Sequence, residues 1–267
     1  MDIIQRNFLR LLRLGAFGQK EQLEPMTAWK WNQLYHMALM YDVVEWVYRG
    51  IERKTDDFFL ALSPSQIRQW QEAAARRSGE SVAAAAPAML TNPLLNRRLQ
   101  RIADADSGTA TYHMFEELLQ TARCILTQGV DLRQHVELGL LIRSQRDAID
   151  YDSLRDWLSQ LRMQRIAKLE ADLLIGLFCF SPEEIKFADG GKGRDVGKNI
   201  SDMFRATKRE MAEWYFTQGK NVFVSTNNSG AMIWHVRHSM KYMRYYPMEA
   251  VTNFMANFAH SLSHIEE

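Results

Sequence analysis

The chain has 267 residues, with 33 Lys and Arg against 32 Asp and Glu, a formal net charge of +1 and 46% hydrophobic residues. A chain of this length and composition can bury a large core, which excludes general disorder, and its near-zero charge removes any bulk electrostatic argument for nucleic-acid binding. Only fourteen glycines and six prolines are present. This scarcity of turn-forming residues favours long helices over many short strands.

Signals for helix starts follow one another along the chain. Thr27, Asn92 and Asp150 are residue types that cap helix N-termini, and Ser63 precedes a first-turn proline. Apolar residues recur at helical spacing after each of them. The sequence therefore predicts helices at about 1–15, 27–49, 64–77, 94–103, 111–128, 132–146, 151–161, 163–178, 200–218, 229–245 and 248–263, with one more starting at Ser181-Pro182-Glu183-Glu184.

The predicted fold is all-α, a multi-helix, bundle-like protein with at most one short strand or hairpin, at 221–225. A polar link follows residue 104. It divides an N-terminal helical lobe, 1–104, from a C-terminal helical lobe, 109–267, and we expect the two lobes to form one compact unit.

The chain carries no strong targeting or membrane signal. No segment reaches the run of about 20 apolar residues that spans a bilayer, and charges interrupt the first fifteen residues, which are typical of a first core helix. Cys124 and Cys179 lie in apolar helical runs without a Cys-x-x-Cys pair. We interpret them as inert, buried thiols of a reducing cytosol, with a single disulfide left open, and we predict a cytoplasmic protein.

A glycine-rich segment at 189–198 is the first candidate site. Lys192 and Arg194 stand among four glycines, and glycine lets backbone N–H groups approach an anion. The spacing of a Walker phosphate loop is missing, and no strand precedes the segment. A surface connection is therefore the favoured interpretation, and an anion site is the alternative.

A basic stripe near the C-terminus is the second candidate. On the predicted helix 229–245, several cations and aromatic rings share one face or lie next to it. Such a face can contact phosphates, although a solvated face opposite a Val and Met core stripe is the favoured alternative. The residues are Trp234, Arg237, His238, Lys241, Arg244 and Tyr245.

Two acidic pairs, Asp104/Asp106 and Asp150/Asp152, have the spacing that metal-dependent nucleotidyl transfer uses. Such a pair must project from a strand, because alternate side chains of a strand point the same way. Both pairs lie at predicted helix ends, so we interpret them as structural. His135, one turn after Asp131, is likewise interpreted as structural. The sequence predicts no catalytic residue, no metal site and no cofactor.

Five patches of the chain are similar to known sequences. They are Phe8–Gly18, Trp31–Ala38, Gln128–His135, Ile149–Leu154 and Met243–Pro247. Together they resemble a bacterial family of uncharacterised nucleotidyltransferase-like proteins. Members of that family carry an α/β catalytic insert with Lys-Gly and Gly-Asp-x-Asp motifs between their helical portions.

The catalytic insert has no counterpart here, since only a short link around 104–108 separates the two helical portions. The resemblance therefore implies a degenerate, non-catalytic protein that acts in binding or regulation. Its partner would be a nucleotide or another polyanion, or a protein. The alternatives are a divergent metal-dependent nucleotidyltransferase using one of the acidic pairs, and a homo-oligomeric interaction scaffold built on the Met- and Trp-rich helices.

Overall fold

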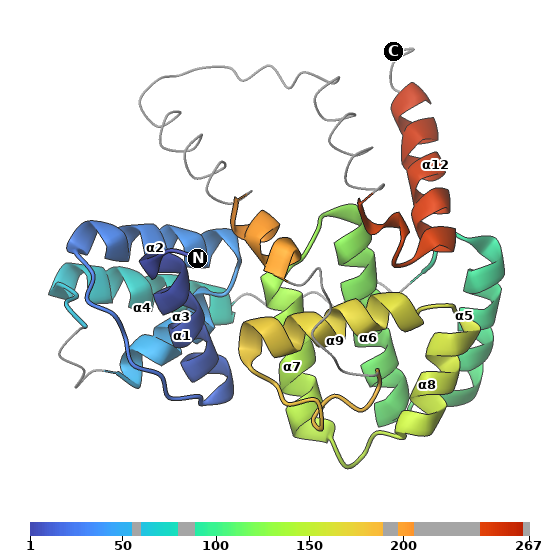
Figure 1. Ribbon diagram of the computed structural model, residues 1–267, viewed down its shortest axis with the longest axis horizontal. Coiled ribbons are helices and arrows are strands. Elements are labelled where there is room, and N and C mark those ends of the chain that lie inside the picture. Colours follow the sequence, from blue (N-terminus) through green and yellow to red (C-terminus); the bar gives the residue numbers. More distant parts are fainter. Residues whose placement is uncertain (55–59, 80–88, 189–196, 206–240, 264–267) are drawn as a thin grey trace. The chain divides into compact units, whose positions relative to one another are not determined.

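The computed structural model describes residues 1–54, 60–79, 89–188, 197–205 and 241–263. These ranges hold ten complete helices and no strand, which confirms the predicted all-α class (Figure 1). The segment 221–225, where the sequence predicts a strand, lies outside the described residues. The helices are α1 (Ile3–Phe17), α2 (Ala28–Met40), α3 (Val44–Glu52), α4 (Pro64–Gly79), α5 (Pro93–Asp106), α6 (Ala110–Thr127), α7 (Leu132–Gln145), α8 (Tyr151–Gln160), α9 (Gln164–Phe178) and α12 (Pro247–Ser263).

The chain divides into two compact units. Unit 1 consists of Met1–Ala85, Leu132–Leu140 and Gly197–Asn221, and unit 2 consists of Ala86–Asp131, Leu141–Val196 and Val222–Glu267. The link at 107–109 joins α5 to α6 inside unit 2, where these two helices pack together. These units therefore differ from the lobes 1–104 and 109–267, because packing and not the polar link sets the division.

Unit 1 is built on a close crossing of α1 and α3. A Cβ atom added at Gly15 would lie 1.7 Å from the Trp46 carbonyl oxygen, and one at Gly50 would lie 2.1 Å from the Leu11 carbonyl oxygen. The two backbones thus approach each other at glycine on both sides, closer than any side chain would allow. The predicted first core helix is confirmed, since its apolar residues Phe8, Leu9, Leu11 and Leu12 are buried.

A break separates α2 from α3, whereas the sequence predicts one helix through both. Asp42 adopts a left-handed φ of 52°, and the N–H of Val43 donates to the carbonyl of Ala38 at 3.0 Å, which closes the helix end. Arg77 donates to the Asp42 carboxylate at 2.5 Å, and Arg133 donates to the Asp42 carbonyl at 2.8 Å. The break depends on these long-range partners, which helical periodicity does not reveal.

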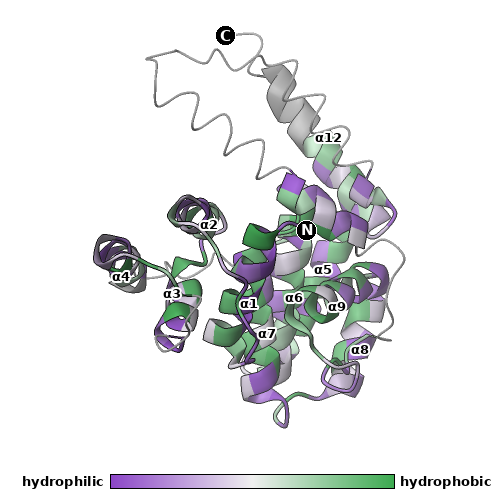
Figure 2. Ribbon diagram, turned by 60° about the vertical axis from the view of Figure 1, so that its left-hand side comes forward, coloured by the Kyte–Doolittle hydropathy of each residue, from purple (hydrophilic) through white to green (hydrophobic). Residues whose placement is uncertain are grey.

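Unit 2 is built around α6, which packs against α5, α8 and α9. The Phe115 ring of α6 meets the Trp157 ring of α8 edge-on, with centroids 5.7 Å apart. In Figure 2 α6 and α9 carry long green, hydrophobic stretches. The caps that the sequence predicts are confirmed at Asn92 and Asp150, whose side chains accept backbone N–H groups of the next helix. Thr109 caps α6 in the same way.

The segment after α9 corrects a second expectation, because 181–184 forms a single turn and not a helix start. The N–H of Ser181 donates to the Glu184 carboxylate at 2.8 Å, as a helix cap would require. The chain then leaves the helical path and buries Ile185 and Phe187. Arg143 of α7 pairs with Glu184 at 3.1 Å and holds the turn in place.

Both cysteines are free thiols. Burial raises the pKa of the half-buried Cys124 to about 11, so this thiol is inert near neutral pH. The expectation that Cys179 is buried is wrong. It is exposed, because it ends α9 in a left-handed conformation one residue beyond the buried Phe178.

Within the described ranges, no helix combines the length and the hydropathy that crossing a membrane requires.

Candidate functional site

The residues proposed from sequence fall mostly outside the part of the chain that the structure describes. Lys192, Arg194, Trp234, Arg237 and His238 are among these undescribed residues. The three others, Lys241, Arg244 and Tyr245, are described and lie just before α12.

Arg244 and Lys241 each contact a neighbouring aromatic ring. The Arg244 guanidinium carbon lies 4.8 Å from the ring centroid of Tyr245, and its Nη2 donates to the Tyr245 hydroxyl at 2.9 Å. The Lys241 ammonium lies 5.0 Å from the ring centroid of Tyr242, which is buried. Tyr245, which Arg244 contacts, also lines the pocket described next.

A pocket of about 310 Å³ lies within unit 2 at the first turns of α9 and α12. Its volume is near the lower end of the roughly 300–1,000 Å³ found for small-molecule sites. Its wall combines cationic, aromatic and apolar side chains. They are Arg162, Gln164, Arg165, Tyr245, Tyr246, Pro247 and Met248.

The α8–α9 turn places the two arginines at the start of a helix. Arg162 adopts a left-handed φ of 58°, and the N–H of Met163 donates to the carbonyl of Leu158 at 2.7 Å. Met163 occupies the N-cap position of α9, where no side chain accepts a hydrogen bond from the first turn. The positive end of the α9 dipole, with its unused N–H groups, therefore lies beside the pocket.

Arg162 and Arg165 bring two positive charges to this helix start. Both side chains are exposed, and neither guanidinium forms an ion pair or a hydrogen bond with a described residue. Both line the same pocket, Arg162 from the turn before α9 and Arg165 from the first turn of α9. Two guanidinium groups and a helix N-terminus thus face the same region, and each of these features favours an anion.

Tyr246 forms the buried part of the pocket wall. Its side chain is 0% exposed, and its hydroxyl has no hydrogen-bond partner among the described residues. Burial, with the carboxylate of Glu249 as a second cause, raises the pKa of the Tyr246 hydroxyl far above its usual value. Tyr246 is therefore a neutral phenol that retains an unused donor.

Glu249 anchors the wall that α12 contributes. It is 3% exposed, and its carboxylate accepts hydrogen bonds from the N–H and the hydroxyl of Thr91, at 2.6 and 2.7 Å, and from the N–H of Asn92 at 3.0 Å. These bonds join the first turn of α12 to the start of α5, and Figure 1 shows the two helix starts close together. Tyr246 and Met248 are held in place by this contact.

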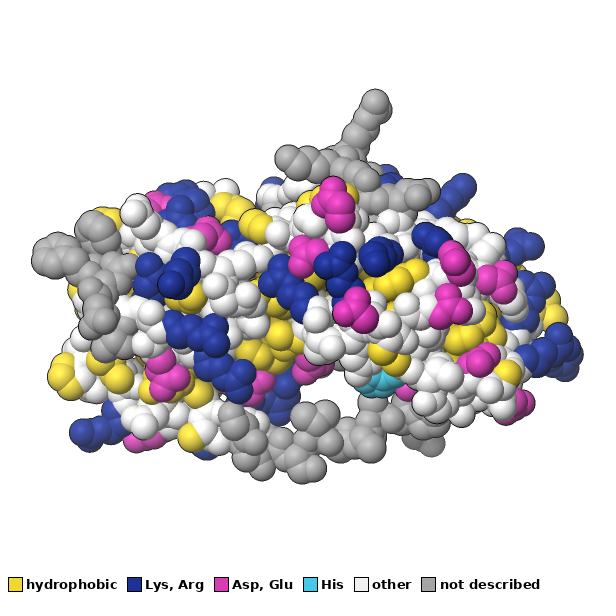
Figure 3. Space-filling model, turned by 90° about the horizontal axis from the view of Figure 1, so that it is seen from below, with side chains coloured by type: hydrophobic (Ala, Val, Ile, Leu, Met, Phe, Trp, Pro, Cys, Tyr) yellow, Lys and Arg dark blue, Asp and Glu magenta, His cyan; other side chains and the backbone are white. Residues whose placement is uncertain are grey.

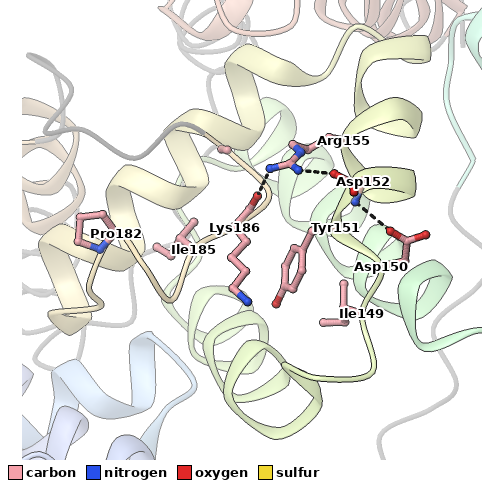
Figure 4. Close-up of a pocket in the computed structure, with 9 residues that line it drawn as sticks. Ile149, Asp150, Tyr151, Asp152, Arg155, Pro182, Ile185 and Lys186 are labelled. Atoms are coloured by element: carbon pink, nitrogen blue, oxygen red, sulfur yellow. Dashed lines mark hydrogen bonds and ion pairs between the residues drawn. The ribbon is translucent and has the colours of Figure 1, made fainter.

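A second, open groove of about 520 Å³ lies where α8 begins (Figure 4). Lys186 lies over the Tyr151 ring, with its ammonium 5.4 Å from the centroid. Arg155 pairs with Asp152 and donates to the Lys186 carbonyl at 3.1 Å. The charges of Arg155 and Asp152 in this groove are thus engaged with each other, in contrast to those of the arginine pocket.

The two acidic pairs that the sequence analysis weighs as metal ligands lie at helix ends. Asp150 caps α8, where it accepts from the N–H groups of Asp152 and Ser153 and from the Ser153 hydroxyl, and these bonds lower its pKa. Asp104 and Asp106 lie in the last turn of α5. Helical neighbours two residues apart point in different directions, so neither pair has the arrangement that a two-metal site needs. No cluster of three His, Cys, Asp or Glu residues suited to a metal ion occurs among the described residues.

Charges of both signs mix on the molecular surface. On the face shown in Figure 3, Lys and Arg side chains are interspersed with Asp and Glu side chains and do not form one basic surface. This mixture agrees with the net charge of +1. It favours a local anion site, such as the arginine pocket, over a broad electrostatic contact on that face.

The sequence analysis missed Arg162 and Arg165. The sequence does carry a signal for an anion site there, since the two arginines flank the predicted start of the helix at 163. The other wall of the pocket comes from residues about 80 positions further along the chain, and only the fold brings the two segments together.

Comparisons with known proteins identify no relative. No family model matches the chain, and neither a curated protein nor a solved structure shows significant similarity to it. The resemblance to nucleotidyltransferase-like proteins therefore stays a prediction from sequence.

Proposed function

We propose that the protein binds a small anionic ligand in the pocket at the first turns of α9 and α12, and that it acts by binding and not by catalysis. The observation that carries the proposal is the pair Arg162 and Arg165 beside the uncapped N-terminus of α9. Neither guanidinium is neutralised by a described acidic side chain. An anion that entered here would meet both cations and the helix dipole together.

Charge reversal at the pocket tests this function. We expect the double variant Arg162→Glu/Arg165→Glu to bind inorganic phosphate at least tenfold more weakly than the unaltered chain, measured by isothermal titration calorimetry at low ionic strength. Both arginines are exposed, so the fold should tolerate the change. Binding should also weaken as salt rises, because salt screens the exposed charges.

The matched control is Arg101→Glu on α5. Arg101 is exposed, lies in the same unit and does not line the pocket. It should leave phosphate binding unchanged. Equal losses in the control and in the double variant would show a general charge effect and would contradict the proposed site.

The family and the cellular location of the protein are proposals as well. We propose that the chain is a degenerate member of the bacterial nucleotidyltransferase-like family, supported by the sequence patches quoted above and by the lack of an α/β insert between α5 and α6. We also propose a cytoplasmic location, which the two free thiols support.

A further inference from the structure

We infer that the ligand of the arginine pocket is a small phosphate monoester whose organic part is a flat aromatic ring. This inference rests on the proposed function and specifies it. Its basis is the division of the pocket wall into a cationic side, Arg162 and Arg165, and an aromatic and apolar side, Tyr245, Pro247 and Met248.

The cationic side fits phosphate better than carboxylate. Two guanidinium groups and the free N–H groups of a helix start offer more donors than the two oxygens of a carboxylate can accept. A phosphate monoester presents three oxygens and close to two negative charges near neutral pH. Helix N-termini and arginine guanidinium groups are both suited to binding phosphate.

The other side of the pocket fits a planar, apolar group. The Tyr245 ring is half-buried and contacts the Arg244 guanidinium. Met248 is half-buried, and Pro247 is exposed next to it. An aromatic ring placed against Tyr245 and Met248 would remove apolar area from water, which free phosphate cannot do.

The size of the pocket limits the organic part. A volume of about 310 Å³ accommodates a phosphate group and one ring system. Tyr246 adds a fully buried aromatic side chain to the lining. The ligand class is thus a small aryl phosphate or a close chemical equivalent.

Calorimetric titrations with three probes test this inference on the full chain. Phenyl phosphate should bind at least tenfold more tightly than inorganic phosphate, and phenol, which lacks the charge, should bind at least tenfold more weakly than phenyl phosphate. Met248→Ala should weaken the binding of phenyl phosphate more than the binding of inorganic phosphate, because the lost apolar contact serves the ring and not the phosphate group. Arg101→Glu serves as the control for the protein's overall charge.

The contrary outcomes separate the two claims. Equal affinities for phenyl phosphate and inorganic phosphate, both lost in Arg162→Glu/Arg165→Glu, would overturn the aromatic ligand and leave the anion site standing. Phenol binding as tightly as phenyl phosphate would overturn the phosphate requirement. If neither phosphate compound binds, the proposed function fails together with the inference.

Discussion

Glu249 attaches α12 to α5, because its carboxylate accepts three hydrogen bonds from the start of α5. Removing it would break the hydrogen bonds from the N–H groups of Thr91 and Asn92 and from the Thr91 hydroxyl. Hydrogen bonds to a carboxylate contribute about 1.5–3 kcal/mol each, and water would replace part of this because Thr91 is exposed. We expect Glu249→Ala to lower the free energy of unfolding by about 3 kcal/mol, measured by urea denaturation. Phosphate binding should weaken as well, since α12 would lose its attachment beside the pocket.

A control for this change is Asp104→Ala. Asp104 is exposed on α5 and has no hydrogen bond or ion pair with a described residue. Its replacement should change stability by less than about 0.5 kcal/mol. Similar stability losses in Asp104→Ala and Glu249→Ala would contradict the anchoring role of Glu249.

Glu170 makes stability depend on pH. Its side chain is 0% exposed, neither carboxyl oxygen has a described hydrogen-bond partner, and burial raises its pKa well above the usual value. The folded protein therefore keeps this proton at pH values where the unfolded chain, with an ordinary pKa of about 4.3, releases it. The contribution of Glu170 to stability is largest at acidic pH and falls as pH rises from about 4.3 toward the raised pKa.

Glu170→Gln removes this titration while keeping the shape of the neutral acid. We expect the stability of the variant relative to the unaltered chain to increase with pH above 5, by up to about 1.4 kcal/mol per pH unit while one proton is released. Urea denaturation at pH 5, 6, 7 and 8 measures this. A difference between the two proteins that stays constant over these pH values would contradict the buried, neutral Glu170.

At the scale of helices, the stability of the protein depends on the close crossing of α1 and α3. A Cβ at Gly50 would lie 2.1 Å from the Leu11 carbonyl oxygen, so the helices would have to move apart. We expect Gly50→Ala to destabilise the protein by about 3 kcal/mol, at the upper end of overpacking costs, measured by urea denaturation.

Gly108 provides the comparison for this glycine. An added Cβ there meets no atom within 4 Å, and its φ is not in the left-handed range. Gly108→Ala should therefore leave stability unchanged or raise it by up to about 1 kcal/mol. A Gly50→Ala variant as stable as Gly108→Ala would show that the close helix crossing is not needed.

The helix starts could be predicted from sequence wherever a local signal sets them. Asn92, Thr109 and Asp150 cap their helices because each side chain bonds an N–H two or three residues later. The break at Asp42 could not be predicted, because its partners Arg77 and Arg133 are 35 and 91 residues away. The prediction of a helix starting at 181–184 is wrong for a similar reason, since burial of Ile185 and Phe187 in the tertiary structure overrides the local cap signal.

The candidate site follows the same division. The two arginines lie next to a helix start that the sequence predicts. The other wall of the pocket, Tyr245 to Met248, comes from a segment about 80 residues further along the chain. The basic stripe includes Tyr245, which lines the pocket, and Arg244, which contacts Tyr245 without lining the pocket itself. Sequence patterns therefore predicted some residues at or near the pocket, whereas the pocket itself depends on how the helices pack.

For the whole molecule, the tryptophans bear on the alternative of an oligomeric scaffold. Trp31, Trp46, Trp70 and Trp157 are buried, and Trp29 is 64% exposed. Most of the tryptophans in the described part of the chain thus serve the cores of the two units. Among the described tryptophans, only Trp29 is available for association through an aromatic surface.

The most direct test of the anion site is a map of where phosphate acts on the chain. In a titration of the isotope-labelled protein with inorganic phosphate, followed by amide NMR, we expect the largest saturable shifts at residues 164–166 and at Met248, because these N–H groups belong to the first turns of α9 and α12. The shifts should disappear in Arg162→Glu/Arg165→Glu. Saturable shifts confined to other parts of the chain, or no saturable shifts at all, would contradict the account.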